Sequence, residues 1–299
     1  MKKIIYTSIL ICVCSLASAQ ALPSLLVNSD PVATAAGGAS ILGSDLHPLQ
    51  NYAALESFSS QKLGAGLSYG SWQPKNAGEK ILAAAASYKI TEKLFVALDW
   101  KSFKYDSYEV VNNSGSVSQI DSKFTPKESA VALGAGYRIL PGISAALTLR
   151  MASSSLAKDA KASVFGLDLS AAYAKEKLRA SIALCNIGGK VNYGGGDYKQ
   201  PSLVRAGASY DIIEGLRAGA ELGYLFEGAF SASLGAEYCW KDIVSARAGY
   251  HYGSKDLGIP SYASTGLGVK YFGVQLNAAY LLASETLAGS LLIGLGYSF

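Results

Sequence analysis

The segment Ala130–Ile139, with the sequence AVALGAGYRI, alternates residue by residue between two kinds of side chain. Val131 and Leu133 share one phase, and Gly134 and Arg138 share the other. Successive side chains of a β-strand point to opposite faces, so the pattern predicts a strand with one apolar face and one small or charged face. A strand of this kind is typical of a transmembrane barrel, in which one face meets lipid and the other faces the lumen.

The same alternation recurs in segments of about ten residues from Lys62 to the end of the chain. Tight links alternate with links that are mostly longer, as in a bacterial barrel with short periplasmic turns and longer outer loops. These features predict an all-β, antiparallel transmembrane barrel of about fourteen strands. The expected strands cover 62–73, 79–90, 93–105, 127–138, 143–152, 161–174, 177–187, 201–212, 215–226, 229–240, 243–252, 261–271, 273–283 and 287–299.

The composition argues against the other broad classes of protein. The chain is 50% hydrophobic and only 16% charged, and it contains 32 Gly and 19 Tyr. After the first residues it has no apolar run of the roughly 20 residues that a membrane-spanning helix needs, while a soluble sandwich usually carries more charge. The formal net charge is +4 with no basic run, so nucleic-acid binding has no support.

The first residues have the features of a secretory signal peptide. Lys2 and Lys3 supply the positive start, Ile4–Leu16 is mostly apolar, and Ala17–Ala19 places small residues at the usual cleavage spacing. The alternative, an uncleaved anchor helix, is disfavoured because the apolar run is too short to span a bilayer. The expected organisation is a signal peptide over 1–19, an N-terminal plug segment over 20–60 and an outer-membrane barrel over 61–299.

Aromatic residues give an independent indication of the barrel. Seven tyrosines fall just before a short turn or the C-terminus, each on the expected lipid-facing phase, as a girdle at one membrane interface requires. They are Tyr88, Tyr137, Tyr173, Tyr210, Tyr238, Tyr271 and Tyr297. The last strand, with Tyr297 and the terminal Phe299, resembles the signal that the barrel-insertion machinery recognises. The expected location is therefore the outer membrane, with lipid around a multi-pass wall.

The residues before the barrel do not alternate. Asp30 followed by Pro31 can start a helix, and Gly37 with Gly38 can end it. This segment is partly apolar and poor in charge, whereas a free tail should be more polar. Because inward wall positions are mostly Ala, Gly and Ser, we expect the segment to pack in the lumen as a plug. The alternative is a narrow open pore with a disordered tail.

The segment before the barrel also carries a family resemblance. Leu25–Asp30, Ala33 and Gly37–Ala39, followed by Asp45 and Asn51–Leu55, resemble the start of mature PorV/PorQ-family proteins. The resemblance implies a fourteen-stranded FadL-like barrel with its N-terminal segment in the lumen. It also implies a non-catalytic accessory role in type IX protein secretion, with the translocon or the surface-attachment components as partners. The plug motif comprises Asp30, Pro31, Ala33, Gly37, Gly38, Ala39, Asp45 and Asn51.

The alternative function is a FadL-like channel for uptake of small hydrophobic molecules. Such a channel needs an apolar cavity beside the plug. The inward phases of the expected strands are instead small, polar or charged.

Catalytic chemistry has little support in the sequence. The chain has only two His, His47 and His251, with no nucleophile-and-base constellation and no close cluster of His, Cys and carboxylates. We therefore predict neither an enzyme nor a metal or cofactor site. Cys185 and Cys239 are expected at opposite ends of the wall, too far apart for a disulfide.

Charged residues on lumen-facing phases are the remaining candidates for a site. Buried charges must be paired, so the favoured interpretation is a network that ties wall to plug. A polar conduction path is the alternative. The candidates are Asp99, Arg138, Arg150, Asp168, Arg179, Arg205, Arg217, Glu221, Glu237 and Arg247.

Overall fold

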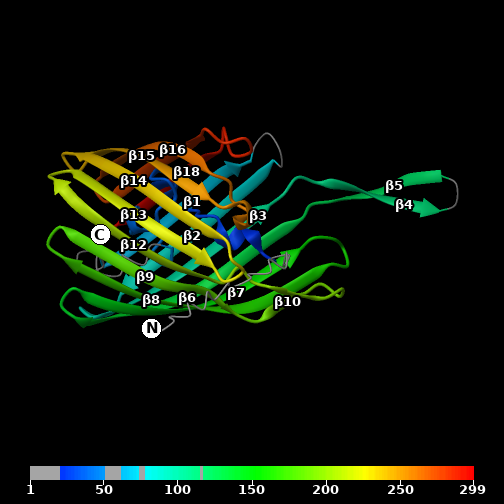
Figure 1. Cartoon of the computed structure of the whole chain (residues 1–299), viewed down its shortest axis with the longest axis horizontal. Coiled ribbons are helices and arrows are strands. Elements are labelled where there is room, and N and C mark those ends of the chain that lie inside the picture. Colours follow the sequence, from blue (N-terminus) through cyan, green and yellow to red (C-terminus); the bar gives the residue numbers. More distant parts are fainter. Residues whose placement is uncertain (1–20, 51–61, 74–77, 115–116) are drawn as a thin grey trace, which may run out of the picture.

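The computed structural model describes residues 21–50, 62–73, 78–114 and 117–299. Fourteen antiparallel strands form a closed barrel in which β1 pairs with β18, so the predicted fold is confirmed (Figure 1). The strands are β1 (Leu63–Trp72), β2 (Glu79–Lys89), β3 (Leu94–Lys104), β6 (Lys127–Leu140), β7 (Ile143–Ser155), β8 (Lys161–Lys175), β9 (Leu178–Gly188), β12 (Leu203–Ile213), β13 (Leu216–Leu225), β14 (Phe230–Trp240), β15 (Val244–Gly253), β16 (Tyr262–Tyr271), β17 (Val274–Leu282) and β18 (Leu291–Ser298).

The links between strands define two ends of the barrel. At one end, which we call the short-turn end, the links are 90–93, 141–142, 176–177, 214–215, 241–243 and 272–273. At the other, the long-loop end, the chain runs through 105–126 and 189–202 among shorter connections. The signal-peptide prediction lies outside the described residues.

Two hairpins at the long-loop end were not expected from the sequence. β4 (Tyr108–Ser114) pairs with β5 (Val117–Phe124), and β10 (Lys190–Asn192) pairs with β11 (Asp197–Lys199). The β4–β5 hairpin projects well beyond the rim of the barrel (Figure 1). The sequence predicts only longer links at both segments, because a hairpin outside the wall has no lipid-facing side and so lacks strong apolar alternation.

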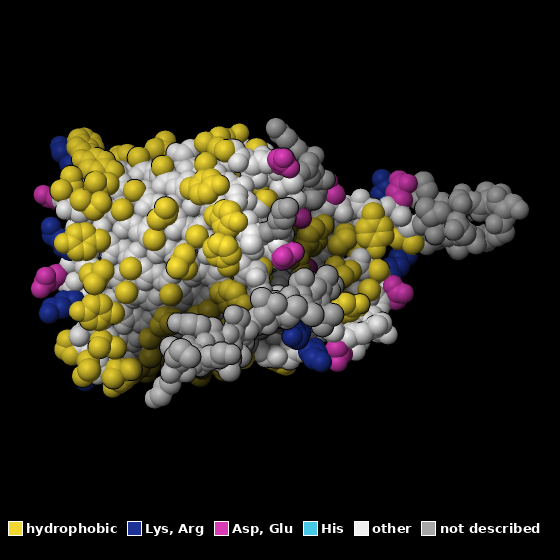
Figure 2. Space-filling model, in the orientation of Figure 1, with side chains coloured by type: hydrophobic (Ala, Val, Ile, Leu, Met, Phe, Trp, Pro, Cys, Tyr) yellow, Lys and Arg dark blue, Asp and Glu magenta, His cyan; other side chains and the backbone are white. Residues whose placement is uncertain are grey.

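The outer face of the wall is apolar. Figure 2 shows hydrophobic side chains spread over the barrel between charged side chains at its two ends. The seven tyrosines of the expected girdle all lie exposed on this face near the short-turn end. No helix among the described residues is long and apolar enough to cross a membrane.

The two cysteines lie at opposite ends of the wall, as predicted. Cys185 is opposite Leu203 near the long-loop end, and Cys239 is opposite Ser245 near the short-turn end. They are not joined by a disulfide.

Candidate functional site: the lumen and its N-terminal segment

Residues 21–50 run inside the barrel and are mostly buried. We call this segment the plug. It contains two single turns of 3-10 helix, η1 (Pro23–Leu26) and η2 (Ser40–Leu42), and the short helix α1 (Pro31–Ala35). Leu49 and Gln50, the last described residues of the plug, belong to a turn.

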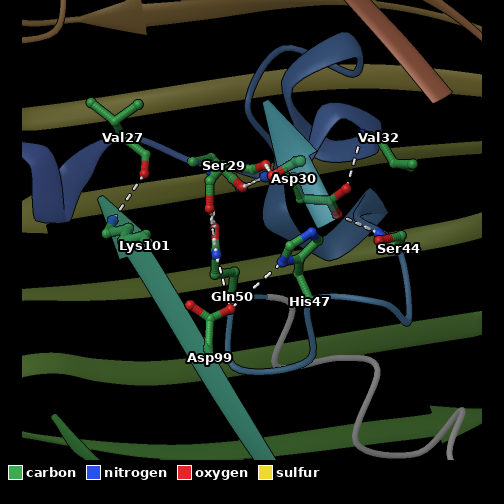
Figure 3. Close-up of polar contacts among 11 residues, drawn as sticks. Val27, Ser29, Asp30, Val32, Ser44, His47, Gln50, Asp99 and Lys101 are labelled. Atoms are coloured by element: carbon green, nitrogen blue, oxygen red, sulfur yellow. Dashed lines mark hydrogen bonds and ion pairs between the residues drawn. The ribbon is translucent and has the colours of Figure 1, made fainter. Parts of the chain in front are cut away.

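Asp30 organises the plug with both carboxylate oxygens. One accepts a hydrogen bond from the Val32 amide at 3.0 Å and so caps α1, and the other accepts one from the Ser44 amide at 2.6 Å (Figure 3). Pro31 follows at the first helical position, where its missing N–H costs no helical hydrogen bond. An N-cap of this kind is worth about 1 kcal/mol.

The plug meets the wall closely where it turns after α1. Gly37 and Gly38 both have φ of +74°, in the left-handed region that favours glycine. A Cβ on Gly37 would lie 2.6 Å from the carbonyl oxygen of Leu234 and from the amide nitrogen of Tyr250. The wall likewise has no side chain at this contact, because a Cβ on Gly249 would lie 2.2 Å from the Gly37 nitrogen. Plug backbone and wall backbone are therefore in direct contact.

Polar contacts fasten the same region to β13 and β16. The Ser264 hydroxyl accepts a hydrogen bond from the Gly37 amide at 2.9 Å and donates one to the Ala35 carbonyl at 3.0 Å. Glu221 accepts from the Ile41 amide at 3.2 Å and from the Ser40 hydroxyl. These bonds satisfy backbone groups at the end of α1 and in η2 that water cannot reach.

On the opposite side, the plug is fastened to β3 (Figure 3). The Gln50 side-chain amide donates to Asp99 at 3.2 Å, and its oxygen accepts from the Ser29 amide at 3.0 Å. The Nδ1 atom of His47 lies 3.6 Å from the Asp99 carboxylate. Asp99 thus faces two plug side chains at once.

Two wall residues that hold the plug were missed by the sequence analysis. The Lys101 ammonium donates to the carbonyls of Ser24 at 2.7 Å and Val27 at 3.2 Å, and Glu128 accepts from the Ser24 amide at 3.1 Å. Lys101 lies two residues after Asp99, and Glu128 two residues before Ala130, both on lumen-facing phases. Strict application of the alternation would have identified them.

The expected lumen charges have partners of different kinds. Asp99 and Glu221 contact the plug, whereas Arg150 pairs with Asp168 and Arg247 with Glu237 within the wall. Arg179 and Arg217 both pair with Asp211. Arg138 lies by the Glu92 carbonyl at the short-turn end, and Arg205 lines two cavities.

The remaining candidates from the sequence are dispersed. Ala33 and Ala39 are buried in the plug, and Asp45 lines a cavity at the short-turn end, whereas Asn51 lies outside the described residues. Tyr297 and Phe299 are exposed, with ring centroids 5.9 Å apart.

The space left in the lumen is small. Two cavities of about 40 Å³ each border the plug, and Asn28 and Arg205 line both. Each has room for only a few water molecules. A larger cavity of about 320 Å³, lined among others by Asp45, Arg217 and Lys270, lies at the short-turn end.

One of the small cavities has several apolar residues in its lining. They are Leu26 of the plug and Trp72, Leu257, Ile259 and Tyr262 of the barrel and its links. We call these five residues the apolar chamber.

An apolar layer surrounds the chamber. Its members are buried. In this layer of the barrel, the expectation that inward positions are small, polar or charged is therefore wrong. In Ile81-Leu82, Leu281-Leu282 and Leu291-Leu292, both phases are apolar, so alternation cannot distinguish the inward residue from the outward one. The layer comprises Trp72, Ile81, Phe103, Tyr262, Leu281, Leu287 and Leu292.

His47 makes the fastening of the plug sensitive to pH. Burial lowers the pKa of His47, but Asp99 on β3 and Asp30 in the plug outweigh it, so the pKa is raised. A raised pKa means that the imidazolium stabilises the folded state below the ordinary His value and ceases to do so as pH rises through the raised value. We expect the plug to loosen on that rise, seen as more frequent openings in single-channel recordings.

The chain offers a matched control for this pH effect. His47→Gln should remove the dependence, whereas His251→Gln should keep it. Equal pH dependence of wild type and His47→Gln would contradict the assignment.

No protein-family model matches the sequence, and no curated protein matches it. Among solved structures, the chain is similar to the CymD monoaromatic hydrocarbon channel, with a TM-score of 0.61 and 14% identity over 92% of this chain and 98% of that one. It is also similar to the Pseudomonas putida toluene transporter TodX, with a TM-score of 0.60 and 13% identity over 91% and 98%.

The chain shares the fold of these hydrocarbon channels. At this level of identity the likeness concerns the fold alone. It agrees with the fourteen-stranded barrel expected from the sequence, but neither channel is described as a secretion component. In the described part of the chain, no group of three or more His, Cys, Asp or Glu side chains could hold a metal ion.

Proposed function

We propose that the chain is an outer-membrane channel for small hydrophobic molecules, closed in its resting state by its own N-terminal segment. The observation that carries the proposal is the apolar chamber between the plug and the barrel, inside a barrel with the fold of hydrocarbon channels. Uptake sites are mostly apolar with a few placed polar groups. His251, Ser233 and Glu221 of the barrel wall supply polar groups to the lining of the same cavity.

The apolar wall sets the orientation in this proposal. The tyrosine girdle lies at the periplasmic interface, so the short-turn end faces the periplasm and the long-loop end faces outward. A hydrophobic molecule would enter the chamber from outside. It would leave toward the cavity at the short-turn end.

Passage requires the plug to move, because the two small cavities are smaller than an aromatic ring needs. The plug is held by individual hydrogen bonds and close backbone contacts, whereas the wall is held by strand pairing. A shift of the plug can therefore open the lumen without opening the barrel.

The chamber itself provides a test. Trp72 lines it, whereas the other two tryptophans, Trp100 and Trp240, lie on the outward phase, so toluene that enters the chamber when the plug shifts should quench Trp72 emission. Leu257→Ser with Ile259→Ser should weaken this quenching by roughly tenfold or more, because two apolar side chains are lost from the site. Both residues lie in the link between β15 and β16, so the barrel should still fold.

Leu156→Ser, in an exposed link elsewhere at the same end, is the matched control and should behave as wild type. Uptake of labelled toluene by cells that lack other hydrocarbon channels should likewise be as fast with the control as with wild type, and slower with the double variant. Saturable quenching that is identical in the double variant and wild type would exclude the chamber as the binding site.

A second candidate is the non-catalytic accessory role in type IX secretion that the sequence resemblance suggests. The projecting β4–β5 hairpin favours it, because a hairpin beyond the membrane is available for protein contacts. Co-purification from native membranes would test it. Deletion of residues 108–124 should release translocon or surface-attachment components if this role is correct, and leave toluene quenching intact in either case.

A further inference from the structure

A row of lysines crosses the outer face of the barrel near the long-loop end. Lys80 of β2 pairs in register with Lys104 of β3, and Lys104 pairs with Lys127 of β6. The row continues through Ser155 of β7 to Lys161 of β8. All four lysines are exposed on the outward phase.

This arrangement is unfavourable for the isolated chain. Directly paired residues have Cβ atoms about 4.5–5.5 Å apart, and like charges placed opposite one another destabilise a sheet. The acidic residues next to the row within the strands, Glu79 and Glu128, are buried on the lumen side. In the described ranges, the exposed Asp106 and Asp159 in the adjoining links form no ion pair with the four lysines. Within the described residues, none of the four lysines forms an ion pair with a carboxylate. The row therefore presents uncompensated positive charge.

The next row toward the middle of the membrane is made of hydroxyl groups. Ser102, Ser129, Ser153 and Ser163 follow one another in register across β3, β6, β7 and β8. The hydroxyls of Ser129 and Ser153 are 2.8 Å apart and hydrogen-bonded. One row further in, the outward residues are apolar and include Trp100, Met151 and Phe165. The order of apolar, hydroxyl and cationic groups matches the order of chains and headgroup in one lipid leaflet.

A single hollow is lined by most of the lysine and serine rows, namely Lys104, Lys127, Lys161, Ser129, Ser153 and Ser163. It has a volume of about 760 Å³, and Phe124 and Thr125 at the base of the β4–β5 hairpin border it. Its volume exceeds what a bare inorganic anion needs. The continuity with the apolar row below favours a molecule that has both a charged headgroup and acyl chains.

The feature is confined to one side of the barrel. At the long-loop ends of β13, β14, β15 and β17, the outward residues are Tyr224, Phe230, Tyr252 and Leu282. A general attraction to a negative membrane surface would not require four lysines on five neighbouring strands and none on the opposite wall.

We propose that the outward face of β2, β3, β6, β7 and β8 binds the phosphate groups of a phosphorylated glycolipid in the outer leaflet. The phosphates lie between the lysines, the serines bond the sugar or ester oxygens, and the acyl chains cover the apolar row. Multiple ammonium groups recognise phosphate as point charges, and the interaction weakens with salt. The inference rests on the membrane placement in the proposed function, but not on what passes through the lumen.

The test uses the full chain folded in zwitterionic detergent micelles. The probes are bisphosphorylated lipid A, the same glycolipid after removal of its phosphates, and inorganic pyrophosphate. Binding is followed by native mass spectrometry and by the rise in unfolding temperature. One variant carries Lys80, Lys104, Lys127 and Lys161 all changed to Gln. The control carries the same change at Lys93, Lys175, Lys177 and Lys241, which are exposed at the short-turn end.

Wild type and control should bind the phosphorylated glycolipid tightly, bind the dephosphorylated form weakly, and bind pyrophosphate no better than the four-lysine variant does. That variant should lose affinity for the phosphorylated form on the order of 1,000-fold, at about 1 kcal/mol per lysine. Equal affinity of variant and wild type would overturn the site, as would tight binding of pyrophosphate alone.

The two proposals fail in distinguishable ways. Loss of glycolipid discrimination in a chain that inserts into vesicles and binds toluene would refute only the lipid site. Failure of the folded wild type to insert into any bilayer would refute both.

Discussion

Replacing Gly37 and Gly38 together by Val is expected to open the lumen while leaving the barrel inserted. Both positions have φ of +74°, where a residue with a Cβ costs about 1–2 kcal/mol. A Cβ at Gly37 would also overlap the backbone of β14 and β15, which cannot retreat without breaking strand pairing. Backbone strain alone should shift the equilibrium toward a displaced plug on the order of 100-fold.

Single-channel conductance in a planar bilayer measures this displacement. Wild type should be nearly closed, and the double variant should show larger or noisier openings. Heat-modifiable gel migration should be unchanged, because the strands bond to one another. Gly194→Val with Gly195→Val is the control, since a Cβ on either glycine meets nothing within 4 Å. A wild type that conducts as an open pore would refute the plug hypothesis.

The barrel was predictable because lipid imposes a strong constraint on sequence. Every second wall residue must be apolar, so period-two alternation identifies each of the fourteen strands, most of them to within a few residues. The largest difference is at β18, expected from 287 and observed from Leu291, because Leu287 is involved in a turn with Ser290. The tyrosines of the girdle are placed as expected for the same reason.

The lumen was harder to predict, because its residues are constrained by contact with the plug and not by contact with lipid. Small inward residues correctly indicated close approach, as Gly249 against Gly37 shows. Which charge would meet the plug could not be derived, because that depends on the path of the plug. Hence Arg150 and Glu237 were expected to tie the wall to the plug, whereas each pairs with a residue of the wall. Lys101 and Glu128 were missed for another reason, because the alternation was not followed to every inward position.

The second large effect is expected at a buried ion pair in the wall. Asp168 is 1% exposed and accepts two hydrogen bonds from Arg150, at 2.6 and 3.2 Å, and one from the Asn186 amide at 2.7 Å. It lies where the register of β8 and β9 shifts between Leu167 and Leu169, so its carboxylate substitutes for regular strand pairing. Asp168→Ala should lower the free energy of unfolding by about 3–5 kcal/mol, because it leaves a buried charge without its counter-ion.

Urea-induced unfolding in lipid vesicles measures that loss, and three further variants identify its cause. Arg150→Met combined with Asp168→Leu should recover most of it, since removing both charges avoids an uncompensated one. Asp168→Asn keeps a hydrogen-bond acceptor but no charge, so its free energy of unfolding should lie between those of Asp168→Ala and the double variant. Glu92→Ala, which removes the exposed partner of Lys89 at the short-turn end, should cost no more than about 1 kcal/mol. If the Arg150→Met, Asp168→Leu double variant were as unstable as Asp168→Ala, packing at the register shift and not charge pairing would be the source of the stability. The ion pair would then be incidental to how β8 and β9 join.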